Sequence, residues 1–101
     1  MASARFVAIV GTQYYFGAKV FQLDQTVVLR KDKENVHDAE AIQAEIVPIG
    51  KVGYIANSVH TVPRGCHSAG RIYDTFEETL QGKVRFIVND VAIVELTDAS
   101  A

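Results

Sequence analysis

Six short runs of apolar and β-branched residues, separated by turn-forming residues, constrain the fold of this chain more than any other feature. In Ile42–Val47, apolar residues alternate with Gln43 and Glu45, as in a strand with one buried and one solvated face. No helix of the length that joins parallel strands lies between the runs, so the sequence predicts a mostly β fold, a small six-stranded barrel, rather than a parallel sheet. The expected strands are Arg5–Thr12, Thr26–Lys31, Ile42–Val47, Lys51–Ala56, Lys83–Val88 and Val91–Leu96.

Two of the connections carry the chemistry of tight turns. Asn89 and Asp90 tolerate positive φ and suit a two-residue type I′ turn, which would set Val88 opposite Val91. The turn at 48–50 contains proline and glycine and would pair the third and fourth runs as a hairpin. Both connections indicate antiparallel neighbours.

Three other segments do not read as strands. Tyr14–Leu23 is rich in aromatic residues and is expected to fold over the mouth of the barrel. Asn57–His67 has no periodicity and is predicted to be a long loop, a feature that is uncommon unless the loop has a function or moves. Ser68 is a plausible N-cap for a short helix that would reach Phe76, although Gly70 weakens that helix by about 1 kcal/mol relative to alanine.

Length and composition are those of one soluble domain. We expect the 101 residues to form a single domain, residues 1–101, with a core of about residues 5–97. The 49% apolar content suffices for a core without a metal, a cofactor or a disulfide. No apolar run approaches the ~20 residues that a membrane span requires, so no membrane association is expected. Cys66 is the one cysteine and cannot form an internal disulfide, which indicates a cytoplasmic protein.

The polar segment Asp32–Ile42 joins the second and third runs, and it is where we look for function. Asparagine and aspartate close such corners by bonding their own backbone two residues on, which would present Asn35, His37 and Asp38 together at a sheet edge. The formal net charge of −2 and the pI near 5.8 argue against a protein that coats duplex DNA. This net charge is still compatible with a local basic groove, because Arg30, Lys31 and Lys33 flank the corner.

Together with its flanking segments, this corner resembles the HIRAN domain, a small β module found in front of helicase-like ATPases of DNA repair and as a stand-alone bacterial protein. The matching segments are Val10–Tyr15, Asp32–Ile42 and Lys51–Ile55, within a similarity that covers roughly Phe6 to Leu96. The resemblance implies a six-stranded barrel related to the OB-fold, with one or two short helices. It also implies a non-enzymatic module of DNA repair that binds the 3′-OH end of single-stranded DNA.

The resemblance also implies roles for individual residues. In HIRAN domains the aspartate that matches Asp38 holds the free 3′ hydroxyl, here with Asn35 beside it, and a carboxylate repels a 3′-phosphate. Tyr14, next to Tyr15, would stack on the terminal base with help from His37, which stands where many family members have a tyrosine.

Contacts to the nucleic-acid backbone are expected from three further residues. Lys31 and Lys33 supply positive charge next to the corner. Gln13 stands where well-studied members of the family have an arginine, so it can donate a hydrogen bond to a phosphate oxygen but brings no charge. With this glutamine, and with His37 in place of the family's tyrosine, RNA, a nucleotide or a modified end remains an alternative ligand.

Several of these residues have a structural alternative. Tyr14 could cap the core, as aromatic rings commonly do. Asp38 could bond only the backbone of the next two residues in an Asx-turn. Arg71 could reach a phosphate or pair internally with Asp74, and the internal pair is favoured.

Two other classes of function compete with the nucleic-acid module. The first is a protein-interaction adaptor whose aromatic segment and Asn57–His67 loop dock a partner. The second is a metal-dependent phosphodiesterase at the corner, although Asp38 lacks a second carboxylate at a convincing spacing. A zinc site at His60, Cys66 and His67 has the right ligand types but poor spacing, so no metal is expected.

Overall fold

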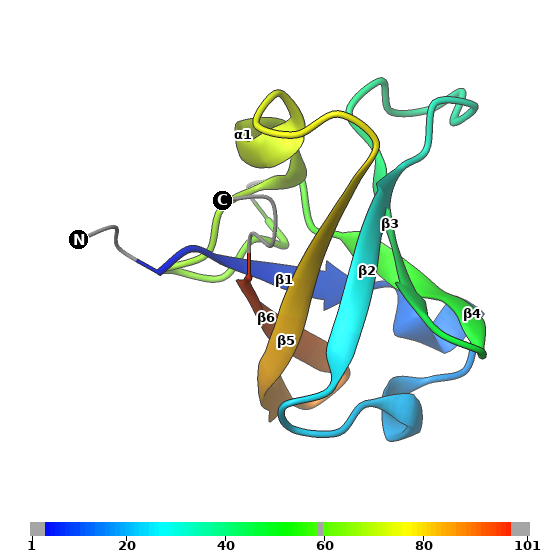
Figure 1. Ribbon diagram of the computed structural model, residues 1–101, viewed down its shortest axis with the longest axis vertical. Helices are drawn as coiled ribbons and strands as arrows, with labels where there is room; N and C mark the ends of the chain where they lie inside the picture. The colour runs from blue at the N-terminus through cyan, green and yellow to red at the C-terminus, as the bar shows by residue number, and fades with distance from the viewer. Residues whose placement is uncertain (1–3, 59, 98–101) are drawn as a thin grey trace.

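The strands close into an antiparallel barrel in the computed structural model, which describes residues 4–58 and 60–97 (Figure 1). Around the barrel the strand order is β1-β4-β3-β2-β5-β6, and each neighbouring pair is antiparallel. The predicted fold class, a mostly β six-stranded barrel, is therefore confirmed. The elements are β1 (Phe6–Val10), η1 (Thr12–Tyr14), η2 (Ala18–Val20), β2 (Thr26–Lys31), β3 (Ile42–Ile46), β4 (Gly50–Ile55), α1 (Ala69–Tyr73), β5 (Thr79–Val88) and β6 (Val91–Leu96).

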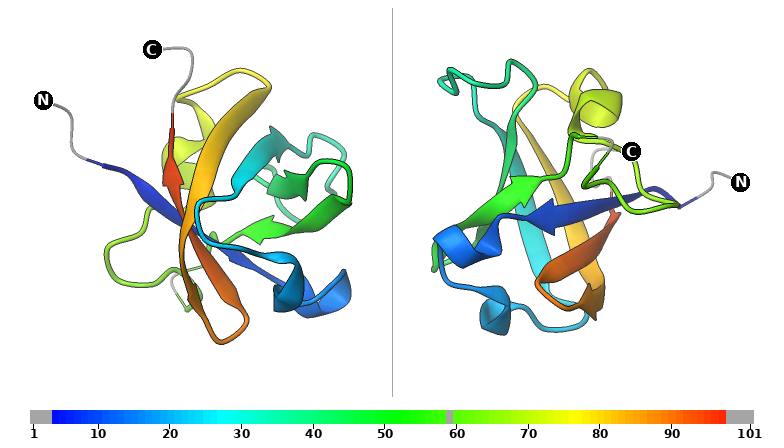
Figure 2. Two further views of the ribbon diagram at one scale, coloured as in Figure 1. Left: turned by 60° about the horizontal axis from the view of Figure 1, so that its bottom comes forward. Right: turned by 180° about the vertical axis from the view of Figure 1, so that it is seen from behind.

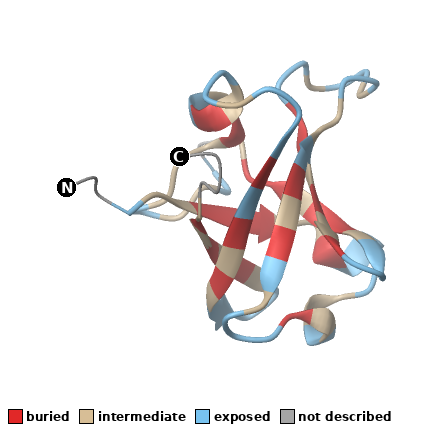
Figure 3. Ribbon diagram, viewed as in Figure 1, coloured by how far each residue is buried: buried red, intermediate tan, exposed pale blue. Residues whose placement is uncertain are grey.

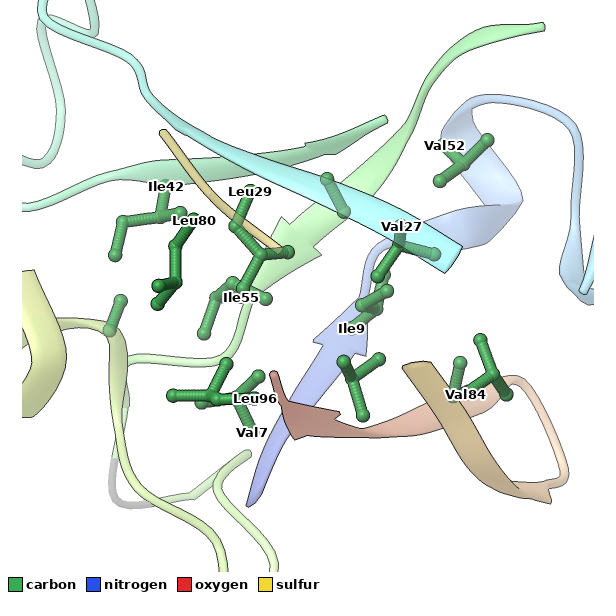
Figure 4. Close-up of a cluster of buried hydrophobic side chains, with 14 of the residues drawn as sticks. Val7, Ile9, Val27, Leu29, Ile42, Val52, Ile55, Leu80, Val84 and Leu96 are labelled. Carbon is green, nitrogen blue, oxygen red and sulfur yellow. The ribbon is translucent and has the colours of Figure 1, made fainter. Parts of the chain in front are cut away.

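Alternating side chains build the core. In β3 the apolar residues are buried, whereas Gln43 and Glu45 on the other face are partly solvated. Figure 3 shows the same alternation along β2 and β5. Inward-facing side chains from all the strands meet inside the barrel (Figure 4), and burying each valine, leucine, isoleucine or phenylalanine side chain contributes about 1.5–3 kcal/mol. Their cluster comprises Val7, Ile9, Phe21, Val27, Leu29, Ile42, Ala44, Ile46, Val52, Ile55, Ala69, Ile72, Leu80, Val84, Ala92, Val94 and Leu96.

Short helices cover the two ends of the barrel. At the end drawn uppermost in Figure 1, α1 buries Ala69 and Ile72 in the core. η2 lies at the opposite end, and Phe21, the residue that follows η2, is buried in the core, so part of the aromatic segment packs onto the barrel. The connection from β4 to α1 runs back along β1, where the His67 N–H donates to the Phe6 carbonyl at 2.7 Å (Figure 2, right). Among the helices that the structure describes, none is long and apolar enough to cross a membrane.

The start of β5 differs most from the sequence prediction. The strand begins at Thr79 rather than at Lys83, and its first residues pair with β2, from Arg30 opposite Thr79 to Val27 opposite Gly82. This pairing closes the barrel. The segment contains polar residues and a glycine, so its pattern does not resemble a strand, but the exposed edge of β2 supplies partners for its backbone.

Smaller corrections concern the ends of elements. β1 stops at Val10 because Gly11, at φ 72°, turns the chain into η1. α1 ends at Tyr73 instead of Phe76, although the predicted Ser68 cap is present, its Oγ accepting from the Arg71 N–H at 3.2 Å.

The predicted pairing of Val88 with Val91 across the β5–β6 turn is confirmed. The predicted turn type is wrong. Asn89 has a φ of 55°, but Asp90, which is also described, does not have positive φ, whereas a type I′ turn needs it at both positions.

Candidate nucleic-acid interface

The polar corner between β2 and β3 is held in shape by its own side chains. The Asn35 Oδ1 accepts from the backbone N–H groups of His37 and Asp38, both at 2.9 Å. The Asp38 Oδ1 accepts from the Glu40 N–H at 2.9 Å. These are the local side-chain bonds that the sequence predicts for asparagine and aspartate, and they leave the His37 imidazole exposed.

Asn57 ties this corner to the rest of the molecule. Its Nδ2 donates to the Asp38 Oδ2 at 3.1 Å, and its Oδ1 accepts from the Gly70 N–H of α1 at 2.8 Å. The corner, the connection after β4 and the first turn of α1 are thus joined through one amide. Sequence reasoning missed Asn57, because its partners lie 19 and 13 residues away and no local pattern marks them.

The corner and the end of β4 enclose a hollow of about 310 Å³, which we term the corner hollow. It brings together Asn35, His37 and Asp38, as the sequence analysis expected. No lysine or arginine is among the described residues that line it. The lining residues are Val10, Asn35, His37, Asp38, Ala41, Tyr54, Ile55, Ala56, Asn57, Ser58 and Thr61.

Tyr14 is the last residue of η1, and Tyr15 follows it directly. Gly11 and the Thr12 hydroxyl, which donates to the Asp90 carbonyl at 3.0 Å, fix the turn that carries them. The Tyr14 side chain is 79% exposed and Tyr15 is 40% exposed. Tyr14 therefore does not cap the core, and its ring is open to a ligand.

Tyr15 connects η1 to the corner hollow through Tyr54, a lining residue of the hollow. The two ring centroids are 6.4 Å apart, within the range of favourable aromatic pairs. The Lys51 Nζ lies 5.6 Å from the Tyr15 ring centroid and 4.9 Å from that of Tyr54. The sequence analysis did not single out Lys51 or Tyr54 as site residues, although both belong to a segment that carries the family resemblance.

A hydrogen-bonded carboxylate supports this tyrosine pair. The Tyr54 hydroxyl donates to Asp32 and accepts from the Lys51 Nζ at 3.0 Å. The bond from Tyr54 holds the pKa of the Asp32 carboxyl below its usual value, against the opposing effect of desolvation. Burial, followed by the nearby Asp32 carboxylate, raises the pKa of Tyr54. The Tyr54 hydroxyl raises the pKa of Lys51, which therefore stays charged at neutral pH.

The three residues expected to contact the nucleic-acid backbone are in different situations. Gln13 is exposed on η1. Lys33 pairs with Glu78 at 2.7 Å, but both side chains are more than half exposed, so the pair is weak. The Lys31 Nζ donates to the Phe76 carbonyl at 2.7 Å and lies 4.3 Å from the Tyr73 ring centroid. Its ammonium group therefore already interacts with other residues of the protein.

The loop before α1 carries the three residues considered for zinc binding, His60, Cys66 and His67. Within residues 4–58 and 60–97, no three histidine, cysteine, aspartate or glutamate side chains come close enough together to hold a metal ion. Burial raises the pKa of the Cys66 thiol, which disfavours the reactive thiolate.

The chain is similar to a known family and to solved structures. The family model for the HIRAN domain matches residues 4–86. The crystal structure of the HIRAN domain of human HLTF is 20% identical, with a TM-score of 0.68, and the match covers 95% of this chain and 74% of that one. A crystal structure of a protein from Lactobacillus plantarum is also 20% identical, with a TM-score of 0.63 and 93% of each chain covered. No curated protein matches this chain.

Proposed function

This chain belongs to the HIRAN domain family, and from that premise we propose that it recognises the 3′-OH end of single-stranded DNA. HIRAN domains are nucleic-acid-binding modules, and they bind rather than catalyse. The proposal assigns the DNA end to the corner hollow and the adjoining tyrosines, and it includes no chemical step.

The observation that carries the proposal is that the Asp38 carboxylate, in the corner hollow, can accept further hydrogen bonds. An ionised carboxylate offers about four lone-pair positions. The bonds from Glu40 and Asn57 use one on each oxygen, so the carboxylate can still accept a hydrogen bond from a hydroxyl. A terminal phosphate in the same place would face a fixed negative charge, with no lysine or arginine among the described lining residues to offset it. This arrangement favours a hydroxyl end over a phosphorylated end.

The base of the terminal nucleotide would lie toward η1. The exposed Tyr14 ring offers a stacking surface for a base, and the His37 imidazole offers a smaller one. Lys51 keeps two N–H donors beyond its bond to Tyr54, so it joins Gln13 and Lys33 as a proposed contact to phosphate oxygens.

Fluorescence anisotropy with one oligonucleotide, carrying either a 3′-OH or a 3′-phosphate, tests the proposal. We expect tighter binding of the 3′-OH form. Asp38→Asn keeps an oxygen acceptor but removes the negative charge, so the variant should bind the two forms with similar affinity. Asp24→Asn is the matched control, because Asp24 lies beyond the opposite end of β2 and has a φ of 66°, which asparagine tolerates. Equal affinity of the parent protein for both ends, or no binding, would rule out end recognition.

A protein-interaction adaptor is the second candidate, and one observation favours it. An apolar hollow of about 490 Å³ lies between the loop before α1 and the β5–β6 hairpin, lined by Phe6, Pro63, Phe86, Val88 and Ile93 among others. Phe86 and Val88 are more than half exposed. If the parent protein binds no oligonucleotide, this surface becomes the leading candidate for function.

A further inference from the structure

A second hollow adjoins the corner hollow on the side of α1. It measures about 260 Å³ and we term it the helix hollow. Asn57 lines both hollows, and the neighbours Thr61 and Val62 line one each. The two hollows therefore form adjacent parts of one surface. The helix hollow is lined by Asn57, Val62, Cys66, His67, Ser68 and Arg71.

The helix hollow differs from the corner hollow in carrying a cation, Arg71. The Arg71 backbone is fixed, because its N–H donates to both the carbonyl and the hydroxyl of Ser68. The side chain is exposed, and it forms no ion pair with any residue that the structure describes, Asp74 included. The internal pair with Asp74 that the sequence favoured is therefore not formed.

Two other arginines of the chain are less available. Arg30 pairs with Glu45 at 2.9 Å, and Arg85 pairs with Asp24 and Glu95. These guanidinium groups already have carboxylate partners, and a phosphate would have to compete with them. Among the described residues, no carboxylate pairs with Arg71 and would compete with a phosphate for it. Its planar guanidinium suits bidentate contact with a phosphate.

We infer that the nucleic-acid strand continues from the corner hollow past Asn57 into the helix hollow, where Arg71 binds a backbone phosphate. This inference rests on the proposed function and specifies its ligand further: a single strand of several nucleotides, rather than a mononucleotide or an isolated end. Contact with phosphate reads no base, so the helix hollow adds affinity and direction but no sequence preference. The 3′ end occupies the corner hollow, and the strand that precedes it crosses the first turn of α1.

The test compares the dinucleotide of thymidine with hexathymidylate, both with a free 3′-OH, on the parent protein and on Arg71→Gln. We expect Arg71→Gln to bind hexathymidylate roughly two- to tenfold more weakly while its affinity for the dinucleotide is unchanged. The slope of log affinity against log salt concentration for hexathymidylate should fall by about 0.7, the value for one phosphate contact on a single strand. Arg71→Lys should keep most of that slope.

Lys83→Gln is the charge-matched control, because Lys83 lies on β5, paired with β2 and β6 on another face of the barrel. A parent protein that binds hexathymidylate, together with an Arg71→Gln variant of the same affinity and salt slope, would overturn the inference and leave end recognition intact. A loss as large in Lys83→Gln as in Arg71→Gln would also overturn it, because the effect would then be one of general charge. A parent protein that binds neither oligonucleotide would remove the proposed function itself.

Discussion

Tyr14 extends its ring into solvent from a single turn of 3-10 helix, although tyrosine rings in small domains are usually at least half buried. Its neighbour Tyr15 packs against Tyr54, and the turn beneath both is held by the buried Thr12. The fold thus supports an exposed aromatic ring without using it for packing. That combination is typical of a binding residue.

Replacing Tyr14 should therefore separate binding from stability. We expect Tyr14→Ala to weaken binding of a single-stranded oligonucleotide by about 1–3 kcal/mol. Its free energy of unfolding should change by less than about 0.5 kcal/mol, as for other surface positions. Tyr73→Ala is the contrasting variant, since Tyr73 packs against the core and beneath Lys31 and its loss should lower stability. Urea denaturation and anisotropy on the same samples measure both quantities, and a large stability loss in Tyr14→Ala would contradict the assignment.

Asp32 offers a test through pH. Because its pKa in the folded protein lies below the ordinary value of 3.8, the folded state binds fewer protons than the unfolded state near that pH. The stabilisation is present above pH ~4 and is lost as the pH falls through the folded-state pKa. Asp32→Asn should lower stability at pH 7 and flatten the decline of stability below about pH 4. Denaturation curves at several pH values check this, with Asp90→Asn in the exposed turn as control; parallel pH profiles for the parent and Asp32→Asn would contradict it.

Residues differ in how far their roles could be read from the sequence. Asn35 and Asp38 bond backbone groups two or three residues away, and such local chemistry follows from residue type. Asn57 and Tyr54 each donate to an aspartate that only the folded barrel brings close, 19 and 22 residues away, so no neighbouring residue marks them. The hydrogen bond from Lys31 to the Phe76 carbonyl is equally non-local, because the two residues are 45 positions apart in the sequence.

At the level of elements, β5 shows why strand boundaries are harder to predict than strands. The predicted bounds of β2 and β6 match the structure, because aliphatic and β-branched residues make up most of both strands. The first part of β5 becomes a strand only through its pairing with β2, where Leu29 faces Leu80. A glycine in such a segment commonly marks a close approach between strands rather than a break.

Gly82 is at such a close approach. A Cβ placed there would overlap the Val94 Cγ1 and lie 2.9 Å from the Glu95 carbonyl oxygen, both closer than van der Waals contact allows. Gly82→Ala should therefore destabilise the barrel by about 1–3 kcal/mol, because β5 and β6 must move apart. Gln81→Ala, at the neighbouring exposed position, should have little effect. Thermal unfolding of both variants tests this, and a Gly82→Ala variant as stable as the parent would show that the strands can separate freely.

At the level of the whole molecule, the apolar pattern was sufficient to predict a small barrel but not how the surface is divided. Figure 1 shows α1 and the corner near one end and η2 at the other, an arrangement that depends on the order of strands around the barrel. That order places η1, the corner hollow and the helix hollow around β4 and the connection that follows it. The polar corner could be identified as a candidate site from turn chemistry and family resemblance, whereas the helix hollow could not.

The central claim is that one continuous face, from η1 through the corner hollow, binds the end of a single strand. The most direct measurement is a two-dimensional NMR titration of isotope-labelled protein with hexathymidylate carrying a free 3′-OH. We expect the largest shifts of backbone amide signals at residues 13–15, 35–38 and 51–57. Signals of β5 next to the hairpin turn, residues 86–88, should move little. Shifts confined to those residues, or no shifts at saturating oligonucleotide, would contradict the claim.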